Sequence, residues 1–334
     1  MSQPLLEVHD LHVEFNGRQG CVRAVRGLTY TINEGESMAL VGESGSGKSV
    51  SALALLSLLP RKSAKITAGS VKFRGEELVG ASEKRMRELR GGSIAMIFQD
   101  PLSSLNPILT ISDQIVEQIQ AHEQAEGKQA KERAIELLDL VGIPGARERA
   151  KQYPHQLSGG MRQRAMIAMA LSAGPDLLLA DEPTTALDVT IQAQILELLA
   201  RLQRDLGMSI LLITHDLGVA AGFTEHLTVM YAGKAVEQGY TSELLSAPNH
   251  PYTLGLLRSI PRLDRPRTNA LIPIAGTPPD MSKGSAGCPF QPRCEYAQTK
   301  CATEAPPFEA ISTNRYIACW NPQHEAIERT GATK

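Results

Sequence analysis

The residues from Gly42 to Ser49 have the types and spacing of a phosphate-binding loop. They fit the pattern G-x-x-x-x-G-K-[ST], after a short apolar run and before a segment of helical periodicity. The glycines let successive backbone N–H groups converge on phosphate oxygens, and the helix N-terminus adds positive potential. Lys48 would reach the outer phosphates and Ser49 would bind Mg²⁺. The pattern predicts a site for a nucleoside triphosphate; the alternative is a glycine-rich turn with a chance lysine. The expected nucleotide contacts are Gly42, Ser44, Gly45, Gly47, Lys48, Ser49 and Val50.

Two carboxylates follow the apolar run Leu177–Ala180. Asp181, at the end of the expected strand, is placed to hold the magnesium shell, and Glu182 can orient and polarise an attacking water. The alternative is a buried strand that runs into a solvated loop. The glycine-rich loop upstream favours the catalytic interpretation.

A second anion site is expected where Ser158, Gly159 and Gly160 open a helix. One nucleotide already has its phosphates wrapped by the first loop. A further site at a helix N-terminus therefore suggests two chains, each of which completes the pocket of the other. The alternative is that Ser158 is only an N-cap.

The elements that must position these residues alternate along the chain. Several apolar runs are too short for helices and predict buried strands, at Ser37–Val41, Ser93–Phe98, Leu177–Ala180 and Ser209–Ile213. Helical segments follow most of them, which predicts an α/β fold with mainly parallel strands. Residues 110–173 have almost continuous helical periodicity and predict a helical subdomain inserted into the α/β core.

The last quarter of the chain has a different composition. Twelve of the 20 prolines lie from Pro248 onward, and four of the five cysteines lie between Cys288 and Cys319. The prolines prevent long regular elements, so this tail should be a loose appendage unless something organises it. We therefore expect a core of residues 1–109 and 174–248, a helical subdomain of residues 110–173 and a C-terminal extension of residues 249–334.

The cysteines of the tail, Cys288, Cys294, Cys301 and Cys319, have the spacing C-x5-C-x6-C-x17-C. Four thiolates can hold tetrahedral zinc or an iron–sulfur cluster. Structural zinc sites favour ligands two to four residues apart, and no pair here is that close, so the spacing favours a [4Fe-4S] cluster over Zn²⁺. Reduced, buried cysteines or a disulfide would also be compatible with this sequence.

Composition and charge narrow the partners. The chain of 334 residues has a formal net charge of -2, which argues against a general nucleic-acid surface. No run approaches the ~18 to 20 apolar residues that cross a bilayer, and the N-terminus lacks the pattern of a secretory signal. These features predict a cytoplasmic chain.

The order of the motifs resembles that of the ATP-binding subunits of ABC transporters, over about residues 5–245. The matching positions are Gly42–Ser49, Gln99, Leu157–Met161, Asp181 and Glu182, Ala186–Asp188, and His215. The fold that this resemblance implies is a P-loop ATPase core with an inserted helical subdomain. Met161 stands where many members of the family have Gln; this leaves the glycine N–H groups in place.

The resemblance also implies a role for each matching residue. Glu182 would be the general base, His215 would contact the γ-phosphate, and Gln99 would sense the γ-phosphate and Mg²⁺. Ser49, Gln99 and Asp181 would surround the magnesium ion. Ser158–Gly160 and Asp188 would contribute to the nucleotide contacts, with Ser158–Gly160 closing over the nucleotide of the partner. Phe15 would stack on adenine, although packing in an N-terminal hairpin is equally compatible with an aromatic there.

Further stretches resemble the dipeptide and oligopeptide importers and their nickel-importing relatives. These are Phe98–Pro107, Asn249–Leu257, Gly287–Phe290 and Pro292–Cys294. The implied partners are a similar second ATPase, two membrane permease subunits and an extracytoplasmic substrate-binding protein, with this chain at the cytoplasmic face of the membrane and no nucleic acid. Three different functions stay open: an importer of nickel or another small solute, a non-transport ABC ATPase acting on DNA or ribosomes, and a tail that senses redox state or metal and regulates the ATPase.

Overall fold

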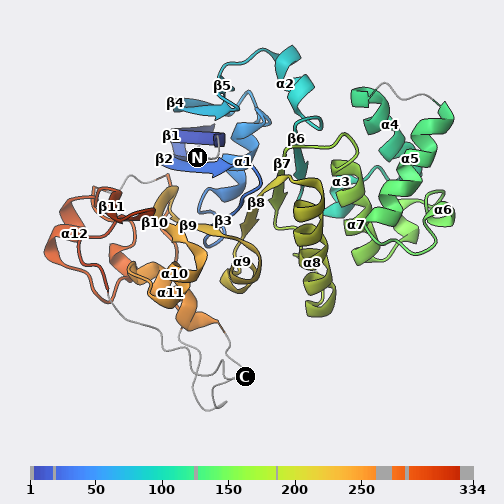
Figure 1. The fold of residues 1–334 in the computed structure, drawn as a ribbon. Helices are drawn as coiled ribbons and strands as arrows, with labels where there is room; N and C mark the ends of the chain where they lie inside the picture. The colour runs from blue at the N-terminus through green and yellow to red at the C-terminus, as the bar shows by residue number, and fades with distance from the viewer. Residues whose placement is uncertain are drawn as a thin grey trace. The chain divides into compact units, whose positions relative to one another are not determined.

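The computed structural model describes residues 4–17, 20–123, 127–185, 187–260, 273–282 and 286–323. These residues form two compact units (Figure 1). The first is built around Gly80–Ile213, and the second contains Leu6–Thr31, Ser37–Val79 and the chain from Thr214 onward. The expected division at residues 109, 173 and 248 stays a prediction.

The first unit contains three parallel strands in the order β6, β7, β8. Their bounds are β6 (Ile94–Ile97), β7 (Leu177–Asp181) and β8 (Ser209–Thr214). All residues of β7 and β8 are buried. This explains why the sequences of both strands are continuous apolar runs, without alternation of polar and apolar residues. The strands predicted in this part of the sequence are confirmed.

The helices of the first unit include the predicted helical block. Their bounds are α2 (Glu83–Leu89), α3 (Pro101–Ser104), α4 (Ile111–Glu123), α5 (Gly127–Leu140), α6 (Ala146–Arg149), the 3₁₀ turn η1 (Pro154–Gln156), α7 (Gly159–Ala170) and α8 (Val189–Leu206). Helices α4, α5 and α7 pack against one another (Figure 1). Between residues 110 and 173, the described residues contain no strand, as expected.

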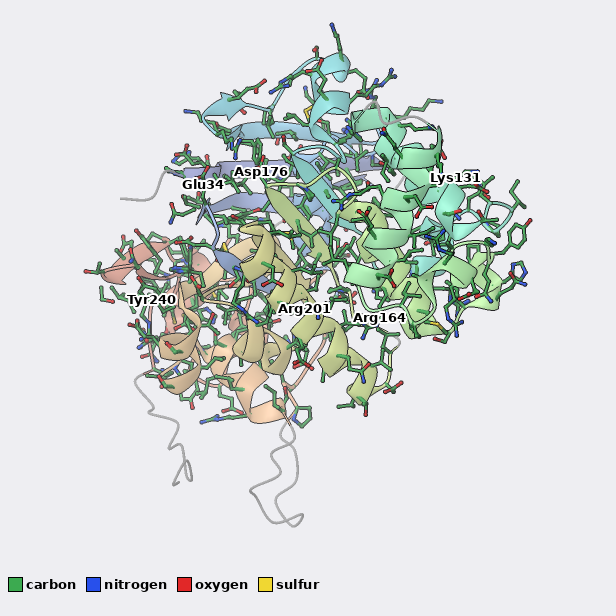
Figure 2. The ribbon with its side chains drawn as sticks, turned by 45° about the vertical axis from the view of Figure 1, so that its right-hand side comes forward. Glu34, Lys131, Arg164, Asp176, Arg201 and Tyr240 are labelled. Atoms are coloured by element: carbon green, nitrogen blue, oxygen red, sulfur yellow. The ribbon has the colours of Figure 1, made fainter. Side chains whose placement is uncertain are left out.

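Two arginines hold the C-terminal end of α5. Arg201 of α8 donates to the Leu140 carbonyl at 2.8 Å, and Arg164 of α7 donates to the Val141 carbonyl (Figure 2). The last carbonyls of a helix lack intrahelical donors and carry partial negative charge, so guanidinium groups stabilise them. This contact fixes α7, the helix that Ser158 opens, against the rest of the helical block.

The second unit contains two sets of strands. An antiparallel sheet has the order β2-β1-β4-β5, and the other strands follow the order β11-β12-β10-β9-β3. Their bounds are β1 (Pro4–Gly17), β2 (Gly20–Asn33), β3 (Ser37–Val41), β4 (Ala64–Phe73), β5 (Glu76–Glu77), β9 (His226–Tyr231), β10 (Lys234–Tyr240), β11 (Glu309–Ser312) and β12 (Arg315–Ile317). Its helical elements are α1 (Lys48–Leu55), α9 (Leu217–Phe223), α10 (Thr241–Ser246), α11 (Pro251–Ser259), η2 (Gln291–Arg293) and α12 (Thr299–Thr303).

The described part of the tail is not a loose appendage, because strand pairing with the second unit organises it. Strand β12 pairs with β10, with Glu237 opposite Ile317, and β11 extends the sheet by one more strand. Strands of three or four residues fit between Pro307 and Pro322, and β11 lies at the edge of the sheet, where short strands are tolerated. The prolines at 261 and 266 lie outside the described residues.

A buried carboxylate organises the place where the tail leaves the core. Glu237 of β10 is 0% exposed and accepts hydrogen bonds from the backbone N–H groups of Asn249 and His250, at 2.8 and 3.0 Å. Its Oε1 lies 3.3 Å from Nη2 of Arg315, on β12. Burial raises the pKa of Glu237, while these donors lower it. The carboxylate thus ties the start of α11 and the last strand to β10.

Replacing Arg315 with Gln should lower the free energy of unfolding by about 3 kcal/mol, because the buried carboxylate of Glu237 loses its cation. Urea denaturation followed by circular dichroism measures this loss. Arg23→Gln is the control: it breaks an exposed pair with Glu14 (3.2 Å), which should cost less than about 1 kcal/mol. Equal urea midpoints for the two variants would contradict the stabilising role of Arg315.

Candidate active site

The phosphate-binding loop of the second unit lies between β3 and α1, as its motif predicts. Gly47 is the N-cap of α1 and has a φ of 100°. A Cβ on Gly47 would lie 2.3 Å from the carbonyl oxygen of Ala24, and one on Gly42 would lie 2.2 Å from that of Met230. Both positions therefore need glycine because neighbouring backbone comes too close for a side chain.

Lys48 lies inside this loop and is 4% exposed. Its Nζ donates to the carbonyls of Gly42 and Glu43, at 2.7 and 3.0 Å, and lies 3.4 Å from the Ser46 hydroxyl. These oxygens hold the ammonium group of Lys48 against the backbone of the loop. Of the other predicted residues, Ser49 and Val50 are half-buried in the first turn of α1, and Ser44 and Gly45 are exposed.

In the first unit the structure brings Gln99 and Glu182 together. Nε2 of Gln99 donates to Oε2 of Glu182 at 2.8 Å, and the Thr185 hydroxyl donates to the same oxygen at 2.8 Å. Asp181, the buried last residue of β7, directly precedes Glu182. The two donors fix the orientation of the Glu182 carboxylate.

The backbone of Glu182 is strained. Its φ of 46° lies in the left-handed region, which non-glycine residues rarely adopt. The Glu182 N–H donates to the carbonyl of Ile213 on β8 at 2.8 Å, so the sheet of the first unit maintains this conformation. Such strain persists only where surrounding structure enforces it, and it concentrates at functional sites.

The residues of the expected second anion site lie at helix N-termini of the first unit. Ser158 is the N-cap of α7 and accepts from the Met161 N–H at 3.3 Å, while Asp188 is the N-cap of α8 and accepts from the Ile191 N–H at 3.0 Å. Gly159 and Gly160 form the first turn of α7. Capping is thus one role of Ser158, and its contact with the nucleotide of a partner stays a prediction. Ala186 lies outside the described residues.

Two predicted residues occupy other positions of the second unit. His215 is exposed and precedes Asp216, which caps α9 by accepting from the Gly218 N–H at 2.7 Å. Phe15 is half-buried on β1, opposite Ala64 of β4. Their predicted contacts with phosphate and adenine stay predictions.

Thr185 and Tyr252 are two residues of the site region whose contacts were not predicted from the sequence. Thr185 orients Glu182, and the hydroxyl group three residues after a candidate base was a usable signal. The Tyr252 hydroxyl accepts from the N–H of Glu43 in the phosphate-binding loop at 2.9 Å. No local signal indicates a contact between residues 209 positions apart.

The four cysteines of the tail lie near enough to affect one another. Burial, with smaller contributions from the thiols of Cys288, Cys294 and Cys301, raises the pKa of Cys319 to about 12. The backbone N–H of Cys288 also donates to the carbonyl of Cys301 at 2.8 Å. However, in the part of the chain that the structure describes, no three His, Cys, Asp or Glu side chains are arranged to hold a metal ion. The predicted metal site therefore finds no support in the placement of these thiols.

The C-terminal and N-terminal parts of the chain match two different families. Residues 25–185 match the ABC transporter family, and residues 236–301 match the C-terminal region of oligopeptide and dipeptide transporters. The dipeptide transport ATP-binding protein DppD of Bacillus subtilis is 50% identical over 318 residues, which cover 95% of each chain. The oligopeptide transport ATP-binding protein OppD of Salmonella typhimurium is 48% identical, over 97% of this chain and 95% of the relative. This chain belongs to the family of ABC transporter ATP-binding subunits.

Solved structures agree with this membership. A dimeric ATP-binding cassette in a post-hydrolysis state with ADP and phosphate has a TM-score of 0.64 and 28% identity, and covers 71% of this chain and 98% of the cassette. This chain is therefore an ATP-hydrolysing enzyme, and it has the predicted α/β P-loop fold. None of the helices in the described ranges has the length and apolar character to span a membrane.

Replacing Gly42 with Ala should weaken ATP binding by about 5- to 150-fold, because the new Cβ would force the loop away from the Met230 carbonyl at a cost of about 1–3 kcal/mol. Titration with a fluorescent ATP analogue measures the dissociation constant. Gly222→Ala is the control, since no atom lies within 4 Å of a Cβ at that position on α9. Unchanged affinity in the Gly42 variant would contradict the close approach seen at this loop.

Proposed function

We propose that this chain is the ATP-hydrolysing subunit of an importer of di- or oligopeptides. The observation that carries the proposal is the match of residues 236–301 to the C-terminal region of oligopeptide and dipeptide transporters, a segment beyond the ATPase motifs. Relatives that are about half identical over nearly the full length carry the names of dipeptide and oligopeptide transport proteins. The match of the tail therefore supports peptides as the cargo, and the ATPase motifs support ATP as the energy source.

The loop residues would bind the triphosphate of ATP. The N–H groups from Ser44 to Ser49 would surround the phosphate oxygens, and Lys48 would exchange its carbonyl partners for the β- and γ-phosphates. In a site that excludes water, such preorganised donors stabilise the charge that develops on the transferred phosphoryl group. His215 would contact the γ-phosphate and Phe15 would stack on adenine.

Glu182 would act as the general base towards the attacking water. Gln99 and Thr185 both donate to Oε2 of this carboxylate, which supports a fixed orientation for proton abstraction. The left-handed backbone of Glu182 supports the same role, because strain of this kind serves to preorganise a reacting group. As the water oxygen forms its bond to the γ-phosphorus, the bond from that phosphorus to the bridging oxygen of ADP would break, and a water proton would pass to the Glu182 carboxylate. The products would be ADP and inorganic phosphate.

The residues predicted to hold Mg²⁺ have the right donor chemistry. The hydroxyl of Ser49, the amide oxygen of Gln99 and the carboxylate of Asp181 are oxygen donors, which this ion prefers. When bound, Mg²⁺ would neutralise charge on the β- and γ-phosphates. Gln99 points its Nε2 at Glu182, an orientation in which one amide can serve both the base and the metal.

The importer would contain several other chains. The proposed assembly has a similar second ATPase, two permease subunits and an extracytoplasmic substrate-binding protein, with this chain bound peripherally at the cytoplasmic face of the membrane. Ser158–Gly160 and Asp188 would face the nucleotide of the second ATPase when ATP closes the dimer. The net charge of -2 supports the absence of nucleic acid from this assembly.

In cells, deletion of this chain should abolish uptake of a labelled dipeptide, and the intact chain should restore it. Glu182→Gln should fail to restore uptake and should lower kcat for ATP hydrolysis by about 10³-fold or more, because water loses its base, yet it should still bind ATP and dimerise. Uptake of labelled nickel in the same strains tests the alternative cargo, and co-purification with ribosomes in place of permease subunits would contradict a transport role. Hydrolysis at the wild-type rate by the Glu182 variant would contradict the role of this residue as the base.

We also propose that Cys288, Cys294, Cys301 and Cys319 bind a [4Fe-4S] cluster, with Zn²⁺ as the alternative. The support is that the thiols of Cys288 and Cys301 contribute to the raised pKa values of Cys294 and Cys319, which requires proximity although the cysteines come from separate parts of the tail. The arrangement of the described side chains does not itself form a ligand set. Binding would therefore require the thiols to lose their protons and move towards the metal.

Anaerobic purification should yield about four iron atoms and four acid-labile sulfides per chain. Cys301→Ser should lose most of both, whereas Cys21→Ser, at an exposed cysteine of β2, should retain them. Stoichiometric zinc in place of iron would show that the four cysteines bind Zn²⁺, and would contradict the cluster. A chain that contains no metal would disprove both.

A further inference from the structure

A bidentate ion pair joins the tail to the phosphate-binding loop within the second unit. Nη1 and Nη2 of Arg293, at the end of η2, lie 2.7 and 3.0 Å from the two carboxylate oxygens of Glu43. Arg293 is 5% exposed and Glu43 is 26% exposed, so water screens this pair little. Glu43 is the residue that follows Gly42 in the loop, so the pair acts directly on the phosphate-binding element.

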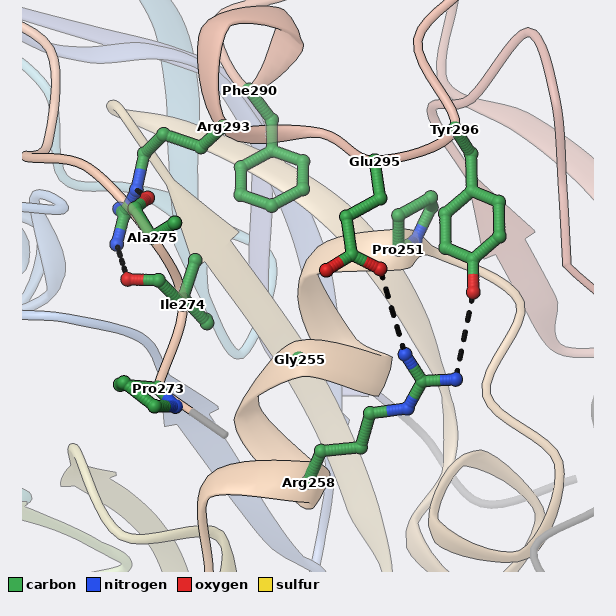
Figure 3. A pocket seen from close by; sticks show the side chains of 10 residues that line it. All are labelled: Pro251, Gly255, Arg258, Pro273, Ile274, Ala275, Phe290, Arg293, Glu295 and Tyr296. Atoms are coloured by element: carbon green, nitrogen blue, oxygen red, sulfur yellow. Dashed lines mark hydrogen bonds and ion pairs between the residues drawn. The ribbon is translucent and has the colours of Figure 1, made fainter. Parts of the chain in front are cut away.

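Arg293 itself is held rigidly. Its Nε donates to the Ala275 carbonyl at 2.9 Å, and Nη2 donates to the Ile274 carbonyl at 3.3 Å (Figure 3). Nη1 also lies 3.3 Å from the Tyr231 hydroxyl. Contacts with separate segments thus preorganise the guanidinium group, so it loses little conformational entropy when it pairs with Glu43.

The loop has a second contact with the tail at the same residue. The Tyr252 hydroxyl of α11 accepts from the Glu43 N–H, and the carbonyl of Glu43 accepts from Nζ of Lys48. The ring of Tyr252 is buried against Phe290, with 5.4 Å between the ring centroids. The side chain, N–H and carbonyl of Glu43 are therefore all engaged, the first two by the tail.

The ion pair also reduces the repulsion between Glu43 and a bound phosphate. A loop that binds the anionic phosphates of ATP carries a carboxylate, which by itself would repel them. Arg293 neutralises that carboxylate and keeps it turned towards the tail. Without the guanidinium, Glu43 would be left partly buried without its cation, next to the site of the phosphates.

We propose that Arg293 is a positioning residue for the phosphate-binding loop, and that ATP affinity depends on the tail through its pair with Glu43. Arg293 lies between Cys288 and Cys294, so any change that releases this cysteine segment should also weaken ATP binding. By reciprocity, bound ATP should stabilise the tail. The inference rests on the proposed role of Gly42–Ser49 in nucleotide binding.

The test measures the dissociation constant of Mg-ATP for the purified full chain. Arg293→Gln should raise this constant on the order of tenfold, while kcat at saturating ATP should change by less than about threefold. Glu43→Gln should have a smaller effect, and the double variant should bind ATP about as well as Glu43→Gln alone, because the unpaired carboxylate is gone. A merely structural role would not produce this rescue.

Arg258→Gln is the matched control. Arg258 lines the same cavity of about 60 Å³ as Arg293, but it faces Tyr296, 3.5 Å away, and Glu295, 3.8 Å away, instead of the loop (Figure 3). Arg258→Gln should leave the dissociation constant of Mg-ATP within about twofold of the wild-type value. Circular dichroism at the assay temperature verifies that each variant is folded, and Arg293→Lys provides a variant that keeps the charge.

Two outcomes would overturn the inference: wild-type affinity in a folded Arg293→Gln chain, or equal losses in Arg293→Gln and Arg258→Gln. Lys48→Ala separates these from a failure of the proposed function. If Lys48→Ala loses ATP binding while Arg293→Gln does not, the loop binds nucleotide without the tail. If Lys48→Ala binds ATP normally, the nucleotide site itself has been assigned wrongly.

Discussion

The second unit depends on one buried carboxylate, that of Glu237. Removing a carboxylate from water costs several kcal/mol unless donors replace the lost hydration. Two backbone N–H groups at the start of α11 and the guanidinium of Arg315 supply them, so the sheet, the helix and the last strand are fixed together. Beside it, burial lowers the pKa of His250 to about 3, and the neutral ring accepts from the Tyr252 N–H at 3.0 Å. Tyr252 in turn reaches the phosphate-binding loop, so the buried carboxylate indirectly determines where the loop lies.

Three carboxylates of this chain show how environment determines what the same group does. Glu237 is enclosed and structural, whereas Glu43 is paired with Arg293. Glu182 instead accepts from the neutral groups of Gln99 and Thr185, which fix its orientation. A fixed orientation suits the role of general base that is proposed for Glu182.

The elements that bury continuous apolar runs were predictable from sequence, and those that depend on distant contacts were not. The sequence predicts strands β3, β7 and β8 because a fully buried strand of five or six residues is a continuous apolar run, in which polar and apolar residues do not alternate. The motif of the phosphate-binding loop was equally clear, because its glycines, Lys48 and Ser49 form one contiguous pattern in the sequence. In contrast, the left-handed conformation of Glu182 arises from the sheet around it, and the pair of Arg293 with Glu43 spans 250 positions. The proline content of the tail suggested a loose appendage, but three residues of β12 are enough to pair with β10.

The uneven composition of the tail acquires a physical meaning from these contacts. A segment with many prolines and few apolar residues cannot build a core of its own, so it must draw its stability from other parts of the chain. In the described tail, three residues contact earlier parts of the second unit: Arg315 pairs with Glu237, Phe290 packs against the ring of Tyr231, and Arg293 pairs with Glu43. Since each of these contacts stabilises both partners, the tail and the phosphate-binding loop are thermodynamically linked. An extension that looks dispensable from the ATPase motifs alone therefore contributes to the shape of the loop for which nucleotide binding is proposed.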